Sequence, residues 1–278
     1  MKSELQEEYK IKKELAEYLE HPRVLVNICS HGNETLGLAV RELCKNIELA
    51  KGSITFNVCN PKAVMEKKRF IESDLNRSFP GSESGTHEEK IAKEMLSYIP
   101  LFDYFFDIHS TGSDNKNSLI YEDNLSEIHQ LISACRCAET ALYISSTSGT
   151  SIFKACRLAD KIIPGMAFEY GDNSDETAGR TFADLRRMFI SLGLVENDTQ
   201  LEFVDNKIRK YECYSVFPRN SDDLIAEGIE NYKLVKRGDI VANSSDGRPI
   251  IAPEDFYPVL FGEPNYTTIF GFMAKESK

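Results

Sequence analysis

Short apolar segments alternate with helix-like segments over the first two thirds of the chain, and this alternation constrains the fold more than any other feature. An apolar run at 23–29 precedes a helical pattern at 36–49, and a second apolar run follows at 53–59. Further along, the patterns predict strands at 103–108, 117–121, 142–146 and 165–171, and helices at 87–99, 125–141 and 182–194. Such alternation is typical of a parallel sheet with helices on its faces. The sequence therefore predicts an α/β fold.

The residue patterns at the two ends of the chain differ from this alternation. Apolar residues recur at near-helical spacing within the first twenty residues, which predicts an amphipathic helix laid on the body of the protein. Past about residue 200, short strand-like runs are separated by turn signals such as Asp246-Gly247. We therefore expect an α/β domain over residues 1–199 and a small C-terminal β domain over residues 200–278.

Composition excludes several classes of function. With 278 residues, of which 41% are hydrophobic, the chain can bury a full core. Its net charge of -11 repels phosphate backbones and anionic membranes, so we expect no nucleic-acid partner, and an anionic substrate needs a local basic pocket. No stretch resembles a signal peptide or a membrane span, which favours a cytoplasmic protein with no membrane partner. Whether the chain forms a homo-oligomer is left open.

Two histidines and a glutamate follow predicted strands. His31 and Glu34 come directly after the run at 23–29, and His109 closes the run that begins at Tyr104. In open α/β sheets, ligands bind beyond the carboxyl ends of the strands. A single His-x-x-Glu motif is weak evidence, but two imidazoles, one carboxylate and a water form a common catalytic zinc site. The sequence thus predicts one zinc ion per chain, held by these three residues.

Another histidine motif does not qualify as a metal site. His87 is followed by two glutamates, but the second histidine that a helical metalloprotease motif needs at i+4 is missing. His21 lies beside a proline, and His129 falls in a polar helix-like segment. We therefore assign no role in metal binding to these three histidines.

Further side chains could serve a hydrolysis reaction. Glu169 ends an apolar strand pattern and is the candidate proton shuttle between water and a leaving nitrogen. Asp107, two residues before His109, should project to the same side, where it either orients a histidine or caps the following loop. Arg69 and Arg77 offer forks for carboxylates or for a developing oxyanion. Asn76, in the same polar loop, makes a substrate role for that loop more plausible.

These residues, taken in order, resemble the succinylglutamate desuccinylase/aspartoacylase family. The resemblance is carried by His31-Gly32-Asn33-Glu34, Asn60-Pro61-Lys62-Ala63, Asp74-Leu75-Asn76-Arg77, Asp107-Ile108-His109, Glu169, Asp246-Gly247-Arg248-Pro249-Ile250 and Pro258-Val259-Leu260-Phe261-Gly262-Glu263. It implies a fold like that of zinc carboxypeptidases, with a mixed, largely parallel sheet flanked by helices and a small C-terminal β domain. It also implies a zinc amidohydrolase that removes an acetyl- or succinyl-type acyl group from a small anionic N-acyl amino acid.

The resemblance also implies roles for individual residues. Glu169 acts as general base and acid, and Arg69 assists the carbonyl. Asn76 and Arg77 hold a carboxylate. Arg157 and Tyr266 are the nearest counterparts of a further arginine and a tyrosine that the family carries. Two alternatives remain open, namely a zinc metallocarboxypeptidase acting on peptides and a non-catalytic binding protein on the same scaffold.

Overall fold

The computed structural model describes residues 19–111, 116–145, 150–157, 161–197, 207–264 and 266–277. The helix predicted within the first twenty residues lies outside this part of the chain up to residue 18, and residues 19 and 20 are not helical. Among the described residues, no helix combines the length and apolarity needed to cross a membrane.

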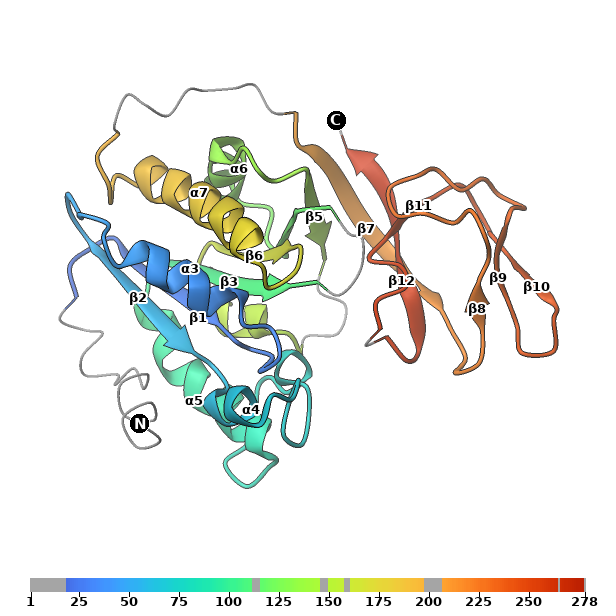
Figure 1. Cartoon of the computed structure of the whole chain (residues 1–278), viewed down its shortest axis with the longest axis horizontal. Coiled ribbons are helices and arrows are strands. Elements are labelled where there is room, and N and C mark those ends of the chain that lie inside the picture. Colours follow the sequence, from blue (N-terminus) through green and yellow to red (C-terminus); the bar gives the residue numbers. More distant parts are fainter. Residues whose placement is uncertain are drawn as a thin grey trace.

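A nine-stranded mixed sheet forms the centre of the protein, in the order β11-β12-β7-β5-β4-β6-β3-β1-β2 (Figure 1). Its strands are β1 (Arg23–Ile28), β2 (Ser53–Val58), β3 (Tyr104–Ser110), β4 (Ser118–Tyr121), β5 (Thr140–Ile144), β6 (Gly165–Tyr170), β7 (Arg209–Pro218), β11 (Tyr257–Val259) and β12 (Ile269–Ser277). Strands β2, β1, β3 and β6 run parallel to one another, and β4, β5 and β7 form a second parallel group. The two groups meet at the antiparallel pair of β4 and β6, so the predicted mixed, largely parallel sheet is confirmed.

Helices cover both faces of this sheet. The α-helices are α3 (Leu36–Cys44), α4 (Pro61–Glu66), α5 (His87–Tyr98), α6 (Ser126–Ala134) and α7 (Asp175–Ser191). Short 3-10 helices lie at Leu75–Arg77, Ile99–Leu101 and Ile152–Cys156. In Figure 1, α3, α6 and α7 lie together on one side of the sheet, and α4 and α5 lie on the other.

Strand β1 shows why the sheet is buried on both faces. Val24 and Ile28 pack in the core that includes residues of α3 and α7, whereas Leu25 packs in the core that includes residues of α5. Alternate side chains point to opposite faces, so a strand covered on both sides needs a continuous apolar run. The sequence of β1 supplies one.

Three predicted helices have different boundaries. Helix α3 ends at Cys44 rather than at 49, where the N–H groups of Lys45 and Ile47 donate to carbonyls three residues back, in turns. The other two differ because of side chains at their ends. Helix α7 begins at Asp175 rather than at 182, since the Ser174 hydroxyl caps it and two acidic residues occupy its first turn. Helix α6 ends at Ala134 rather than at 141. The buried Asp184 carboxylate there accepts hydrogen bonds from the backbone N–H groups of residues 136–138, which gives these groups partners outside a helix.

The C-terminal part contributes to two sheets. Strands β7, β12 and β11 extend the central sheet, and β8 (Leu224–Ile225), β9 (Ile240–Asn243) and β10 (Pro249–Ile251) form a separate three-stranded antiparallel sheet. An aromatic cluster that includes Phe217, Phe256 and Phe270 packs in this part. The predicted boundary between residues 199 and 200 lies outside the described residues, and the division into two domains stays a prediction.

Candidate active site

The chain turns sharply at the end of β1 and forms the loop that carries two of the candidate ligands. Cys29 adopts a φ of 55°, a left-handed conformation that side chains disfavour. The turn is held from β2, because Cys59 donates its N–H to the carbonyl of Ile28 at 2.9 Å and Asn60 donates to that of Cys29 at 3.2 Å. The following residues therefore leave the sheet at a fixed angle and reach across the end of β3.

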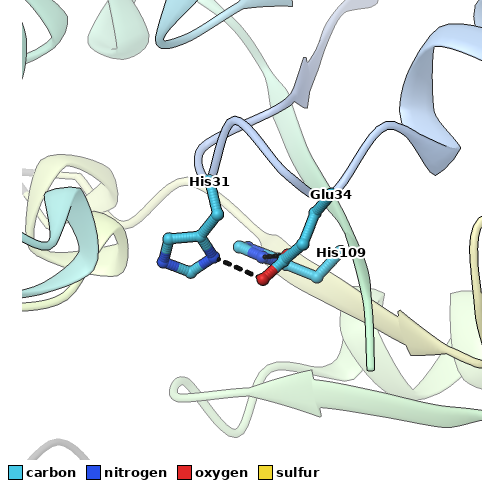
Figure 2. Close-up of side chains that lie close together, drawn as sticks. All are labelled: His31, Glu34 and His109. Carbon is cyan, nitrogen blue, oxygen red and sulfur yellow. Dashed lines mark hydrogen bonds and ion pairs between the residues drawn. The ribbon is translucent and has the colours of Figure 1, made fainter. Parts of the chain in front are cut away.

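His31, Glu34 and His109 converge at this point. Figure 2 shows the three side chains pointing toward one another, with His31 and Glu34 on the loop after β1. The Nδ1 atom of His31 lies 2.8 Å from Glu34 Oε1, and the Nδ1 atom of His109 lies 2.8 Å from Glu34 Oε2. One ligand atom from each residue falls within 4.8 Å of the others, and all three residues are buried. The group predicted from sequence is thus assembled in the fold.

The second nitrogen of each imidazole faces a carboxylate. His109 Nε2 lies 2.8 Å from Asp107 Oδ2, and His31 Nε2 lies 3.1 Å from Asp74 Oδ1. A carboxylate on the far nitrogen fixes ring orientation and tautomer, as commonly found for histidines that bind metals. The predicted contact of Asp107 with a histidine is confirmed. Each Nδ1 is left to face the centre of the site.

The donor set fits a divalent cation. Among the residues that the structure describes, the buried His31 Nδ1 has no hydrogen-bond partner, although it lies 2.8 Å from Glu34 Oε1. Burial alone would lower the pKa of His109, but the negative charges of Asp107, Glu169 and Glu34 outweigh it and raise that pKa well above its usual range. The surroundings therefore favour positive charge at this position. Two nitrogens and one carboxylate are ligands that zinc accepts at about 2.0–2.2 Å.

Glu169 lies beside the three candidate ligands. Strand β6 pairs in register with β3 so that Glu169 is the direct neighbour of His109. Desolvation by the surrounding protein raises the pKa of Glu169 to about 7; His109 opposes this rise, and the charges of Glu34 and Glu263 add to it. A carboxylate with such a pKa can both accept and return a proton near neutral pH.

Arg69 connects the loop after β1 to a neighbouring segment. Its guanidinium lies 2.7 Å from Glu34 Oε1 and 3.2 Å from Asp74 Oδ2, and its carbonyl accepts a hydrogen bond of 2.9 Å from Gly32 N–H. These contacts hold the arginine against the candidate ligands. Its guanidinium is therefore in a position to face a carbonyl that is held at the same site.

A cavity of about 430 Å³ opens onto these groups. Its lining residues are His31, Asn33, Glu34, Arg69, His109, Ser110, Thr111, Glu169, Asp172, Asn173, Leu260, Glu263, Pro264 and Tyr266. The last four come from the C-terminal part, so Tyr266 lines the cavity, and its role in substrate binding stays a prediction. The volume suits a small molecule, and the C-terminal part forms one wall of the cavity.

Three other residues predicted from sequence do not line this cavity in the part of the chain that the structure describes. Asn76 Nδ2 lies 3.4 Å from His109 Nε2, and Arg77 donates from its own guanidinium to the Asn76 carbonyl at 2.9 Å. Arg157 pairs with Asp123 at 3.0 Å. Their roles in substrate binding stay predictions.

Two acidic residues near the site were not recognised as parts of it. Asp74 holds both His31 and Arg69, and its only signal in the sequence was its place in the Asp-x-Asn-Arg motif. Glu88 is buried in the first turn of α5, yet its sequence context resembles a solvated helix start. Burial of such a carboxylate depends on partners far away in the sequence, which no local pattern shows.

Comparisons with known proteins identify relatives of this chain in sequence and in fold. Succinylglutamate desuccinylase of Shewanella frigidimarina is 22% identical over 275 residues, covering 87% of this chain and 78% of that protein. The N-acyl-aromatic-L-amino acid amidohydrolase (carboxylate-forming) of Xenopus tropicalis is 26% identical over 272 residues, covering 85% and 86%. The crystal structure of murine aminoacylase 3 superposes with a TM-score of 0.72 at 18% identity, covering 92% and 95%. The family model for the succinylglutamate desuccinylase/aspartoacylase catalytic domain matches residues 20–182, which is more than half of the chain, and the protein therefore belongs to that family.

Proposed function

We propose that this protein is a zinc-dependent amidohydrolase that removes an acyl group, of acetyl or succinyl type, from a small N-acyl amino acid. The observation that carries the proposal is the convergence of His31, Glu34 and His109 beside Glu169 in the lining of one cavity. The relatives named for deacylation support the reaction type, and a cytoplasmic location is part of the same proposal.

The three ligands and Glu169 have complementary tasks. A zinc ion held by His31, Glu34 and His109 would polarise a carbonyl and lower the pKa of water. Glu169 takes a proton from the attacking water as the water oxygen forms its bond to the carbonyl carbon. The same proton then passes to the leaving nitrogen as the C–N bond breaks, which yields a carboxylic acid and a free amine.

Two arginines of the protein are proposed to contact the substrate. Arg69, held against Glu34, stabilises negative charge that develops on the carbonyl oxygen. Arg77, with Asn76, binds the free carboxylate of the amino acid, as the family resemblance implies. Tyr266 contributes to the pocket wall on the C-terminal side, and Arg157 stays a candidate for a further substrate contact.

Peptide cleavage by a metallocarboxypeptidase is the main alternative, since it uses the same chemistry. The contribution of Leu260, Glu263, Pro264 and Tyr266 to the cavity favours small substrates, because this wall limits the room for a polypeptide. A non-catalytic binding protein would have no need for Glu169 beside three metal ligands.

A substrate panel tests the proposal directly. Zinc-loaded protein is assayed on N-acetyl and N-succinyl amino acids, on their α-carboxamides, and on short peptides with a free C-terminus. We expect release of free amino acid from one of the first two groups, and a much lower kcat/KM for the matched carboxamide. Preference for peptides, or equal kcat/KM for an acid and its carboxamide, would contradict the proposed substrate.

A further inference from the structure

A buried carboxylate outside the cavity joins three segments that surround the candidate active site. Glu88, in the first turn of α5, has no exposed surface. Its Oε1 accepts hydrogen bonds from Asn60 Nδ2 at 2.9 Å and from the N–H of Ile71 at 2.7 Å. Its Oε2 accepts from the N–H groups of Glu72 and Ser73, both at 3.0 Å. One side chain thus holds three consecutive backbone donors and an amide from a different element.

The hydrogen bonds of Glu88 to the N–H groups of residues 71–73 fix a segment next to Arg69. The segment 71–73 lies between Arg69 and Asp74 in the chain. The Arg69 side chain contacts Glu34, and the Asp74 carboxylate contacts the far nitrogen of His31. The carbonyl of Arg69 also accepts the N–H of Gly32. When Glu88 fixes the three N–H groups, it therefore fixes the backbone on both sides of them.

The contact between Glu88 and Asn60 affects the loop that carries His31 and Glu34, through α4. Asn60 caps α4, because its Oδ1 accepts the N–H of Ala63 at 3.2 Å while its Nδ2 donates to Glu88. The backbone of α4 packs directly on Gly32, where an added Cβ would lie 2.2 Å from the carbonyl carbon of Ala63. The position of α4 therefore limits where the loop of His31 and Glu34 can lie.

The start of α5 does not itself require this carboxylate as a cap. Thr86 and Glu89 already form a complete capping box, with Thr86 Oγ1 accepting from the N–H of Glu89 and the Glu89 carboxylate accepting from the N–H of Thr86. The bonds of Glu88 instead point away from α5, to segments that are 15 to 28 residues away in the sequence.

We propose that Glu88 is a positioning residue that sets the metal-binding loop and Arg69 at once, through segment 71–73 and through Asn60. It touches neither the candidate ligands nor the cavity. The kinetic part of this inference rests on the proposed function, whereas its metal-binding part rests on the geometry of the site alone.

Glu88→Gln is the test variant, because the amide keeps the shape of the side chain but replaces one acceptor oxygen with a donor that faces N–H groups. Zinc affinity is measured by competition with a chromophoric chelator, and kcat on the best N-acyl amino acid of the panel. Removal of groups that orient ligands from outside typically weakens metal binding by about 10- to 100-fold, and we expect a loss in this range together with a lower kcat. Glu89→Gln is the matched control. It changes the adjacent charge but keeps a capping box, and should leave zinc affinity and kcat unchanged.

A mutant cycle separates positioning from general destabilisation. If Glu88 acts through Arg69, Glu88→Gln should lower kcat less in an Arg69→Ala background than in the wild type, whereas independent effects would be additive. Additive effects, or wild-type zinc affinity and kcat in Glu88→Gln, would overturn the inference.

If Glu88→Gln fails to fold, Glu88→Asp replaces it in the same assays, since it keeps the charge but cannot reach all four donors. Weaker zinc binding in folded Glu88→Asp supports the inference, and unchanged binding overturns it. A wild-type protein that binds zinc but hydrolyses no N-acyl amino acid would refute the proposed function, and the zinc comparison would still decide the role of Glu88.

Discussion

Gly32 lies between the two candidate ligands of the loop after β1, and the structure predicts that no side chain fits there. A Cβ added to Gly32 would lie 2.2 Å from the carbonyl carbon of Ala63 and 2.4 Å from the backbone nitrogen of Val64. Both atoms belong to the backbone of α4, so neither can move away by a rotamer change. Gly32→Ala must therefore displace the loop, the helix or both.

The expected cost follows from the tightness of this contact. Overpacking a well-packed site typically destabilises by about 1–3 kcal/mol, and we expect Gly32→Ala to lower the free energy of unfolding by that amount. The hydrogen bond from Gly32 N–H to the Arg69 carbonyl lies in the displaced segment as well. Zinc affinity should fall together with stability, because His31 and Glu34 move with the loop.

Gly179→Ala provides a matched control. Gly179 is exposed within α7, and an added Cβ there meets no atom within 4 Å. Alanine is favoured over glycine in a helix by about 0.8–1 kcal/mol, so this variant should be slightly more stable than the wild type. Urea unfolding at pH 7 and chelator competition for zinc are measured on both variants. A Gly32→Ala protein with wild-type stability and wild-type zinc affinity would refute the packing argument.

Four further predictions concern the site and its support. His109→Ala should lose the zinc ion that we expect at one per chain, and undiminished zinc by elemental analysis would contradict the assignment of this ligand. Glu169→Gln should keep zinc but lose about 10²- to 10⁴-fold in kcat, and a near-normal kcat would mean that another group transfers the proton. Arg77→Ala should raise KM with little change in kcat, and Arg69→Ala should lower kcat; the reverse split in steady-state kinetics would exchange their roles. Burial alone would raise the pKa of Glu88, but its N–H donors lower it below the usual value, so its stabilisation is present above about pH 4.3 and is lost as the pH falls through the folded pKa. Unfolding free energies between pH 7 and pH 3 should therefore depend less on pH in Glu88→Gln than in the wild type.

The sequence predicted strands β1 to β6 of the central sheet and the polar residues that converge at its edge, because both depend on local patterns. Continuous apolar runs identify strands that are buried on both faces, and a polar residue directly after such a run lies at the end of the sheet. His31 and His109 could be found in this way although they are 78 residues apart. Strand periodicity placed Asp107 on the side of His109, since residues two apart share a face, and the structure decides for the histidine contact.

The rest depended on contacts between distant segments. Helix α6 ends early because Asp184, from α7, supplies acceptors for the N–H groups that follow it. The burial of Glu88 depends on donors from segment 71–73 and from Asn60, and no periodicity encodes these partners. Arg77 illustrates a different limit, because its motif identifies a family role but not the direction of its guanidinium.

Zinc titration with a simultaneous activity assay tests the central claim most directly. Protein stripped of metal by a chelator is titrated with Zn²⁺ while release of free amino acid from the preferred N-acyl amino acid is followed. The account predicts negligible hydrolysis without zinc and a rise that saturates at one equivalent per chain, and predicts no such rise in His109→Ala. Full hydrolysis by the metal-free protein, or a wild-type response in His109→Ala, would contradict it.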